Sequence, residues 1–388
     1  MSMKRALIIT MTAIFVVCAL MIVDALAHPS WGIVVDRHHQ VYFSDLENIW
    51  KIDAQGRLKM FRHGVSGKHT HDLRMDEDGN LYGEDLSYEP ATQRYTSSLW
   101  KMTPAGELTY ILAPTTDPPQ GMSLWRDRDG NMYSALWKSN SEHELLILKR
   151  TPDGRVSTLL GSPEAVSRLR QDVLYSLGGM AFGRDGSLYL TDGLSVRKLT
   201  MDGTVTTLTR NLTVEQPADN PMGSGPEIRL LGLAVDAQGN VLTADYSNRR
   251  VLKIAPGQEA ATLMRTEPPW SPAGVAVSGS DLYILEVGFT PPRTYIGPRV
   301  RKLSSDGEIT VLAIVGEGQK ISEGETSTGE TNETGENVES ASAGNIGREH
   351  VIGRRLLYAL LAAGAALLAL FLIIRRARRR VWSRESGV

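Results

Sequence analysis

Between residues 28 and 315 the chain alternates short apolar runs with tight polar turns, and one phrase returns six times. Each copy holds a short apolar strand, a polar turn and a second strand that usually carries Tyr, as in GIVVDRHHQVYFSD and GMAFGRDGSLYLTD. The six copies begin at Gly32, His71, Gly121, Gly179, Gly232 and Gly274. Alternation bounded by Gly, Asp and Asn is typical of paired antiparallel strands. The pattern therefore predicts a β-hairpin at the start of each repeat.

A second half follows each predicted hairpin. It has a strand of the hydrophobic-Lys-hydrophobic type, a turn and a last strand, as in KRTPDGRVSTLL. The six lysines are Lys51, Lys101, Lys149, Lys198, Lys253 and Lys302. A four-stranded unit with two apolar faces must stack on neighbours, and such a period is typical of β-propellers. We expect an all-β fold, a six-bladed β-propeller of four-stranded antiparallel blades over residues 28–315.

One repeat also carries a family resemblance. The stretch GLAVDAQGNVLTADYSNRRVLKI, residues 232–254, resembles a complete repeat of the NHL-repeat propellers, and the similarity extends over residues 31–315. More distantly the chain is similar to the gluconolactonase and senescence-marker propellers. That second resemblance implies a divalent metal ion in the central channel. In this chain glycines begin most of the inner strands where those relatives place metal ligands.

Residues 1–27 have the pattern of an export signal. Lys4 and Arg5 precede a long apolar run, and Ala25-Leu26-Ala27 forms a small-x-small site for a signal peptidase. The alternative is an uncleaved signal anchor. The only cysteine, Cys18, lies in this run, so we expect no disulfide in the exported body.

The other end predicts a membrane anchor. Residues 316–350 are rich in Gly, Glu, Ser, Thr and Asn, a composition that favours a disordered tether. Residues 356–374 form an uncharged apolar run long enough to cross a bilayer as a transmembrane helix. The arginine-rich tail 375–388 favours a cytoplasmic C-terminus. We expect a single-pass membrane protein with the propeller on the exported side, periplasmic or extracellular.

Charge excludes one class of partner. Lys and Arg total 42 against 44 Asp and Glu, so no basic surplus points to nucleic acid. The chain also lacks the G-x-S-x-G elbow of serine hydrolases, and it lacks a phosphate-binding loop.

Blade topology assigns the polar motifs to two faces. Turns between strands one and two, and between three and four, share one face of a propeller, whereas the longer connections share the other. In HTHDLRMDEDGNLYGED, residues 69–85, we therefore assign Asp76, Glu77 and Asp78 to turn chemistry. His69, His71, Glu84 and Asp85 fall on the face with the long connections, which is the expected binding face.

Acidic residues recur where the second strands end. They are Asp45, Asp85, Asp192, Asp245 and Glu286. Two interpretations stay open. Each acid accepts hydrogen bonds within its own repeat, or the acids together hold a cation or a cationic ligand.

His71 takes the place of a glycine in the aligned repeats. Alternate spacing puts His69 and His71 on one side of a strand, beside Glu84, and two histidines with one carboxylate could hold a divalent metal ion. The alternative is that both histidines bond to loop carbonyls.

The interpretation that we favour is a membrane-tethered propeller that acts as a binding module. Its ligand would be a small molecule, a glycan or an exported protein, held at the face with the long connections. The alternative is a metal-dependent hydrolase or lactonase.

Overall fold

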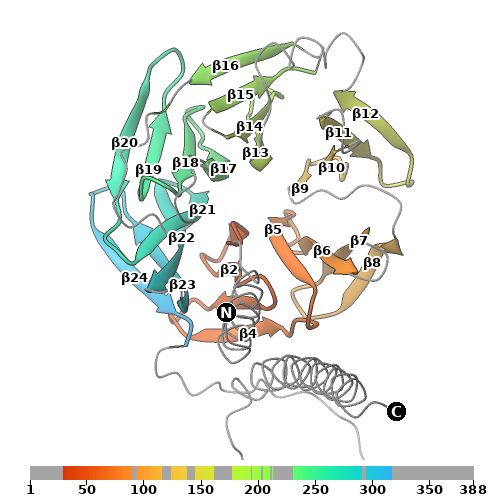
Figure 1. Ribbon diagram of the computed structural model, residues 1–388, viewed down its shortest axis with the longest axis horizontal. Coiled ribbons are helices and arrows are strands. Elements are labelled where there is room, and N and C mark those ends of the chain that lie inside the picture. The colour runs from red at the N-terminus through yellow and green to blue at the C-terminus, as the bar shows by residue number, and fades with distance from the viewer. Residues whose placement is uncertain are drawn as a thin grey trace, which may run out of the picture. The chain divides into compact units, whose positions relative to one another are not determined.

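The computed structural model describes residues 29–89, 94–115, 124–137, 145–160, 177–193, 195–201, 204–209, 212, 230–290 and 294–316. All of them lie within one compact unit, Ala27–Glu325. Their strands form six four-stranded antiparallel sheets, arranged as blades around a common axis (Figure 1). The prediction of an all-β, six-bladed propeller is confirmed.

Each sheet is made of four strands that follow one another in the chain. Blade 1 contains β1 (Ile33–Val35), β2 (Val41–Ser44), β3 (Ile49–Ile52) and β4 (Leu58–Arg62). Blade 2 contains β5 (His69–Met75), β6 (Leu81–Glu89), β7 (Arg94–Met102) and β8 (Leu108–Thr115). Blade 3 contains β9 (Leu124–Arg126), β10 (Met132–Trp137), β11 (Leu145–Arg150) and β12 (Val156–Leu160).

The second half of the ring repeats this order. Blade 4 contains β13 (Leu177–Phe182), β14 (Leu188–Asp192), β15 (Ser195–Leu199) and β16 (Val205–Thr209). Blade 5 contains β17 (Leu230–Val235), β18 (Val241–Asp245), β19 (Arg250–Ile254) and β20 (Ala260–Arg265). Blade 6 contains β21 (Trp270–Ser278), β22 (Asp281–Thr290), β23 (Thr294–Leu303) and β24 (Ile309–Ile314).

The predicted segments at the two ends lie outside the described residues. These are the signal segment 1–27, the tether 316–350 apart from Gly316, the apolar run 356–374 and the tail 375–388. Across the described ranges, no helix has the length and apolar character needed to cross a membrane.

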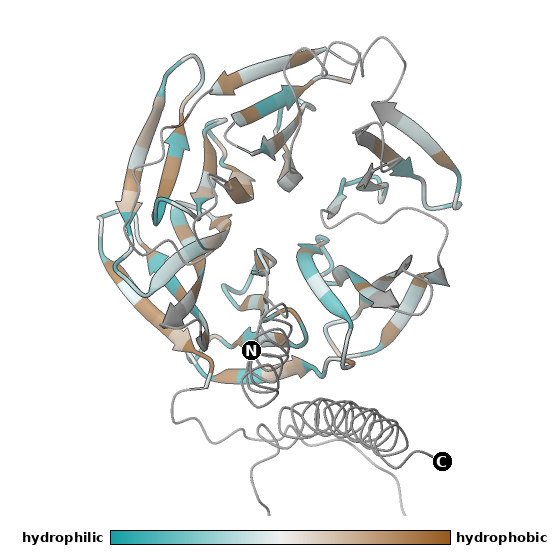
Figure 2. Cartoon of the chain, in the orientation of Figure 1, coloured by the Kyte–Doolittle hydropathy of each residue, from teal (hydrophilic) through white to brown (hydrophobic). Residues whose placement is uncertain are grey.

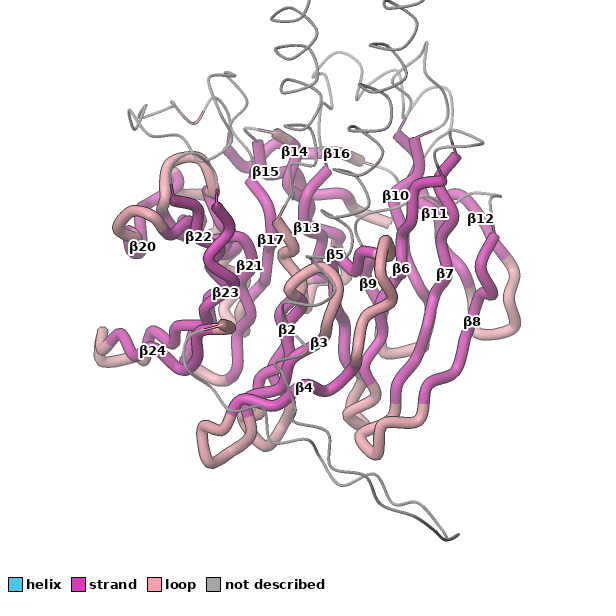
Figure 3. The backbone as a smooth tube through the Cα atoms, turned by 60° about the horizontal axis from the view of Figure 1, so that its bottom comes forward, coloured by secondary structure: helices cyan, strands magenta, loops and turns pink. Residues whose placement is uncertain are grey.

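The turns between first and second strands have the predicted Asp chemistry. Asp76 Oδ1 accepts hydrogen bonds from the backbone N–H groups of Asp78, at 3.1 Å, and Asn80, at 2.8 Å, while Oδ2 accepts from the Tyr82 hydroxyl at 2.9 Å. Gly79 supplies the positive φ of 82° that the turn requires. Tight turns of several blades lie together along one edge of the ring (Figure 3). Asp76 is therefore a turn residue.

Three of the six repeated lysines, Lys51, Lys149 and Lys198, pack on tyrosines of their own blades. In the strand register Lys51 lies opposite Tyr42 and Lys198 opposite Tyr189. The Lys51 ammonium lies 5.0 Å from the Tyr42 ring centroid, which is cation–π distance. These lysines support the sheets, and stacking occurs within a blade rather than on the neighbouring blade.

The ring closes by packing between the first and last blades. Ile33 and Phe43 of blade 1 share a buried cluster with Leu285 and Val300 of blade 6, while each sheet keeps its own four strands. Hydrophobic positions fill most of the strands in Figure 2, whereas β5 is mainly hydrophilic. Burial of apolar surface between blades is thus the main source of stability.

Inner strands of neighbouring blades approach through glycine. A β-carbon added to Gly179 would lie 2.6 Å from the Leu233 nitrogen, and one added to Gly232 would lie 2.7 Å from the Gly274 α-carbon. Real side chains do not fit at such distances. Glycine is therefore required where these inner strands meet.

Candidate functional site

The first of the acids at the ends of second strands stabilises its own loop. Asp45 Oδ1 accepts hydrogen bonds from the backbone N–H groups of Glu47, at 3.0 Å, and Asn48, at 2.6 Å. Its Oδ2 accepts from Trp50 Nε1 at 2.7 Å. This is the local arrangement expected of Asp in a turn.

Asp85 forms a buried ion pair across a blade boundary. Its two oxygens accept from the two terminal nitrogens of Arg62 at 2.8 and 2.6 Å, in a bidentate pair. Oδ1 also accepts from Thr70 Oγ1 at 2.9 Å and from Trp100 Nε1 at 2.8 Å. Since Arg62 belongs to β4, this carboxylate joins blade 1 to blade 2.

Asp192 and Asp245 pair with arginines on the next strand of the same blade. Arg197 lies 3.3 Å from Asp192, and Arg250 lies 2.7 Å from Asp245. Asn248 Nδ2 donates a further bond to Asp245 at 2.8 Å. Burial raises the pKa of Asp245, and the bonds from Asn248 and Arg250 only partly offset this effect.

Glu286 completes the series. Its carboxylate is fully buried and bonds to Arg299 and Arg301 on β23. Asp45, Asp192, Asp245 and Glu286 bond within their own repeats, as one interpretation predicts, whereas Asp85 also pairs with Arg62 of the preceding blade. Binding of a shared cation or cationic ligand by this set stays a prediction.

The two histidines begin β5 together, as the alternate spacing predicts. His71 is buried, with 2% of its surface exposed, and its ring centroid lies 6.0 Å from that of His69 and 5.4 Å from that of Trp31. Burial lowers the pKa of His69, although Glu47 opposes this shift. Burial thus favours the uncharged imidazole of His69, a form that carries one hydrogen-bond donor and one acceptor.

Glu84 is buried on β6 beside this pair. It faces a bulge of β5, because Thr70 pairs with Asp85 and Leu73 pairs with Gly83. Within the described part of the chain, no group of three or more His, Cys, Asp or Glu side chains is placed to hold a metal ion. The metal set of His69, His71 and Glu84 stays a prediction.

The strand register corrects one step of the sequence alignment. Ile33 pairs with Phe43 of β2, and Leu73 occupies the equivalent place opposite Gly83 of β6. Asp72, and not His71, therefore stands where Gly32 stands in blade 1. The sequence agrees with this register, because Asp72 precedes Tyr82 by the same ten positions by which Gly32 precedes Tyr42.

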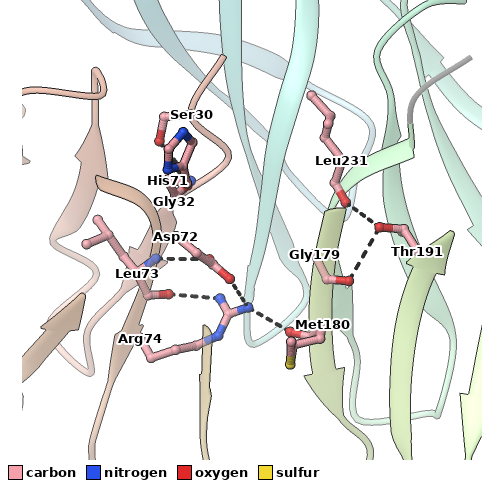
Figure 4. Close-up of polar contacts among 10 residues, drawn as sticks. All are labelled: Ser30, Gly32, His71, Asp72, Leu73, Arg74, Gly179, Met180, Thr191 and Leu231. Atoms are coloured by element: carbon pink, nitrogen blue, oxygen red, sulfur yellow. Dashed lines mark hydrogen bonds and ion pairs between the residues drawn. The ribbon is translucent and has the colours of Figure 1, made fainter. Parts of the chain in front are cut away.

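Asp72 belongs to a polar contact that connects blades 2 and 4 (Figure 4). The Arg74 nitrogen Nη2 donates to Asp72 Oδ2 at 2.8 Å and to the Met180 carbonyl of β13 at 2.6 Å. Nη1 donates to the Leu73 carbonyl at 2.8 Å. The guanidinium carbon lies 4.8 Å from the ring centroid of Trp125, on β9 of blade 3. Arg74 thus links the inner strands of three blades.

Sequence reasoning missed Asp72 and Arg74. The available signal was the composition of the inner strands. HTHDLRM carries four charged or imidazole side chains, whereas the equivalent strands IVV, LGGMAF and LLGLAV carry none. An inner strand of this composition indicates a polar centre.

Comparison with known proteins gives distant similarities. No family model matches the chain. Teneurin-3 of Danio rerio is 24% identical over 282 residues, which cover 62% of this chain, and the chain spans about a tenth of that protein's length.

Solved propellers are more distant in sequence. A virginiamycin B lyase from Staphylococcus aureus has 15% identity and a TM-score of 0.45, with 73% of this chain and 83% of that chain covered. A gluconolactonase from Xanthomonas campestris has 13% identity and a TM-score of 0.44, with 66% and 83% covered. The six-bladed fold rests on the strand topology, and no activity follows from similarities of this size.

Proposed function

We propose that the propeller is a binding module whose ligand sits at the face opposite the tight turns. The observation that carries this proposal is the asymmetry of the connections. Strands one and two, and strands three and four, are joined by tight turns closed by backbone hydrogen bonds, such as Gly79 N to Asp76 O at 3.1 Å. The strand ends at the opposite face are separated by residues 161–176 and 210–229. Long connections on a rigid ring are typical of binding surfaces.

The chemistry near that face suits a ligand with both polar and apolar groups. His69 and His71 begin β5 there, and Trp31 packs on His71 and on Tyr246 and Val287. Imidazole nitrogens can donate or accept, and aromatic rings supply contact area. We propose a small molecule, a glycan or an exported protein segment as the ligand class.

Paired variants test this assignment. The full-length protein is screened for binding of lactones, oligosaccharides and exported peptides by thermal shift, and hits are titrated. His69→Ala should weaken binding of a hit at least tenfold. Glu77→Ala, at the exposed tight-turn face, should leave it unchanged and is the matched control. Loss of binding in Glu77→Ala alone would contradict the proposal.

A metal-dependent hydrolase or lactonase is the second candidate. The observation in its favour is that the His69 and His71 rings lie 6.0 Å apart, with Glu84 buried on the paired strand, although the described residues form no preformed set of three ligands. Elemental analysis of the purified protein separates the candidates, because this enzyme requires a stoichiometric divalent metal ion. A lactone turned over by the metal-loaded protein, and not by His71→Gly, would favour the enzyme.

We also propose that the chain is exported and anchored by residues 356–374, with the propeller outside the cytoplasm. This proposal rests on the signal pattern of residues 1–27 and on the arginines after the apolar run.

A further inference from the structure

Near the centre of the ring, the inner strand of blade 2 carries a side chain where the inner strands of four other blades have glycine. Gly32, Gly179, Gly232 and Gly274 let their blades pack closely on the next inner strand. Asp72 takes this position in β5 and carries a carboxylate. A side chain there prevents an equally close approach of the following blade. Asp72 and the Arg74 guanidinium occupy this place.

Two buried donors in this place have no acceptor among the described residues. They are Arg74 Nε and Trp125 Nε1. The guanidinium carbon lies 4.8 Å from the Trp125 ring centroid, so both donors belong to one stacked contact. Buried N–H groups are nearly always paired in native proteins. Their orphaned state at this contact points to an acceptor that binds there.

We propose that the stacked Arg74 and Trp125 side chains bind a small carboxylate. Arginine forms its strongest hydrogen bonds with such oxygen anions, and the indole supplies a second donor. Among the described residues, Asp72 is the one carboxylate that bonds to Arg74, since the other two acceptors are the uncharged carbonyls of Leu73 and Met180. A monoanion adds one negative charge beside the Asp72–Arg74 pair, whereas a phosphate dianion adds two. Because the pair itself is neutral, a carboxylate leaves less uncompensated charge there than phosphate does, so it is favoured over phosphate.

The tight-turn face carries a pocket close to Trp125. A pocket of about 250 Å³ lies where β13, β17 and β21 end, and its lining includes Phe182, Arg184 and Asp236. Phe182 packs on Trp125 with ring centroids 6.0 Å apart. The residues of the carboxylate site, Asp72, Arg74 and Trp125, differ from those proposed to hold the main ligand, so this proposal does not depend on that one.

Titration of the full-length protein with sodium acetate and sodium benzoate tests the site. Calorimetry and thermal shift should show saturable binding of a carboxylate, whereas acetamide, benzamide and sodium chloride at equal ionic strength should show none. Arg74→Met should abolish binding. Trp125→Phe keeps an aromatic ring but removes the Nε1 donor, and should weaken binding about tenfold.

Arg126→Gln is the matched control. Arg126 is the next residue on β9, but it stacks on Tyr82 at 4.5 Å in the interface with blade 2. Its removal should leave carboxylate binding unchanged. If Arg74→Met fails to fold, Trp125→Phe decides the question. Absence of carboxylate binding to the wild-type protein, or unchanged binding in Trp125→Phe, overturns the proposal.

Discussion

Removal of the Asp85 carboxylate should strongly destabilise the propeller. Asp85→Ala leaves the Arg62 guanidinium, of which only 8% of the side chain is exposed, without its carboxylate. It also removes the acceptor of Trp100 Nε1 and Thr70 Oγ1. These groups connect β4 of blade 1 to blade 2, so the effect falls on a blade boundary.

The magnitude follows from the burial of the pair. Breaking a buried ion pair by removing one partner costs about 3–5 kcal/mol, because the remaining charge is uncompensated. For a domain of this size, a loss of about 4 kcal/mol lowers Tm by roughly 8–16 °C. The double variant Arg62→Met/Asp85→Ala should be more stable than Asp85→Ala, because it leaves no buried unpaired charge.

Urea denaturation followed by fluorescence measures these free energies of unfolding in a double-mutant cycle. Asp85→Asn is a further control, since it keeps the shape of the side chain but loses the charge. If Asp85→Ala loses less than about 1 kcal/mol, the range of exposed ion pairs, the ion pair does not stabilise the ring. Asp85 would then return to the ligand-binding set.

Three further predictions follow from the same chain. Arg74→Ala should lower the free energy of unfolding in urea by about 3–5 kcal/mol, because it leaves Asp72 buried without its cation. The double variant Asp72→Gly/Arg74→Ala should be more stable than Arg74→Ala. A less stable double variant contradicts the assignment. The pKa of Asp185 is lowered to about 2. Partial burial acts to raise this pKa, but it is outweighed by hydrogen bonds, of which the one from Lys198 has the largest effect. Because this value lies below the ordinary 3.8, the contribution of Asp185 to stability is present above about pH 4 and is lost as the pH falls towards 2. The urea midpoint of Asp185→Asn should therefore depend less on pH in this range than that of the wild-type protein. An identical pH dependence refutes the assignment. Protease added to the outside of intact cells or spheroplasts should cut the chain within residues 316–350 and release the propeller, which a gel would show as a soluble fragment. Protection of the segment would reverse the proposed topology.

The fold was predictable because it depends on local patterns that recur. Six copies of strand, turn and strand were sufficient to count the blades, and Asp76 could be assigned to a turn from its sequence neighbours alone. The contact between Arg74 and Met180 joins residues more than a hundred positions apart. No local pattern encodes which carbonyl a long side chain will meet across the ring.

The equivalence of Asp72 with Gly32 is present in the sequence. Ten residues separate Asp72 from Tyr82 and Gly32 from Tyr42, and the bulge opposite Glu84 recurs opposite Thr191 and Ala244 in blades 4 and 5. His71 was identified for a departure from glycine that belongs to Asp72. Its burial against Trp31 is a separate property, and that property keeps it in the candidate site.

The seam between blades 1 and 6 has a consequence for how such a ring can evolve. No strand crosses the seam, because each sheet contains four consecutive strands of its own. A duplication or deletion of one blade's gene segment would therefore add or remove a complete sheet and leave every other sheet intact. Such an event would also require the new neighbouring inner strands to pack on each other, as glycine allows in blades 1, 4, 5 and 6.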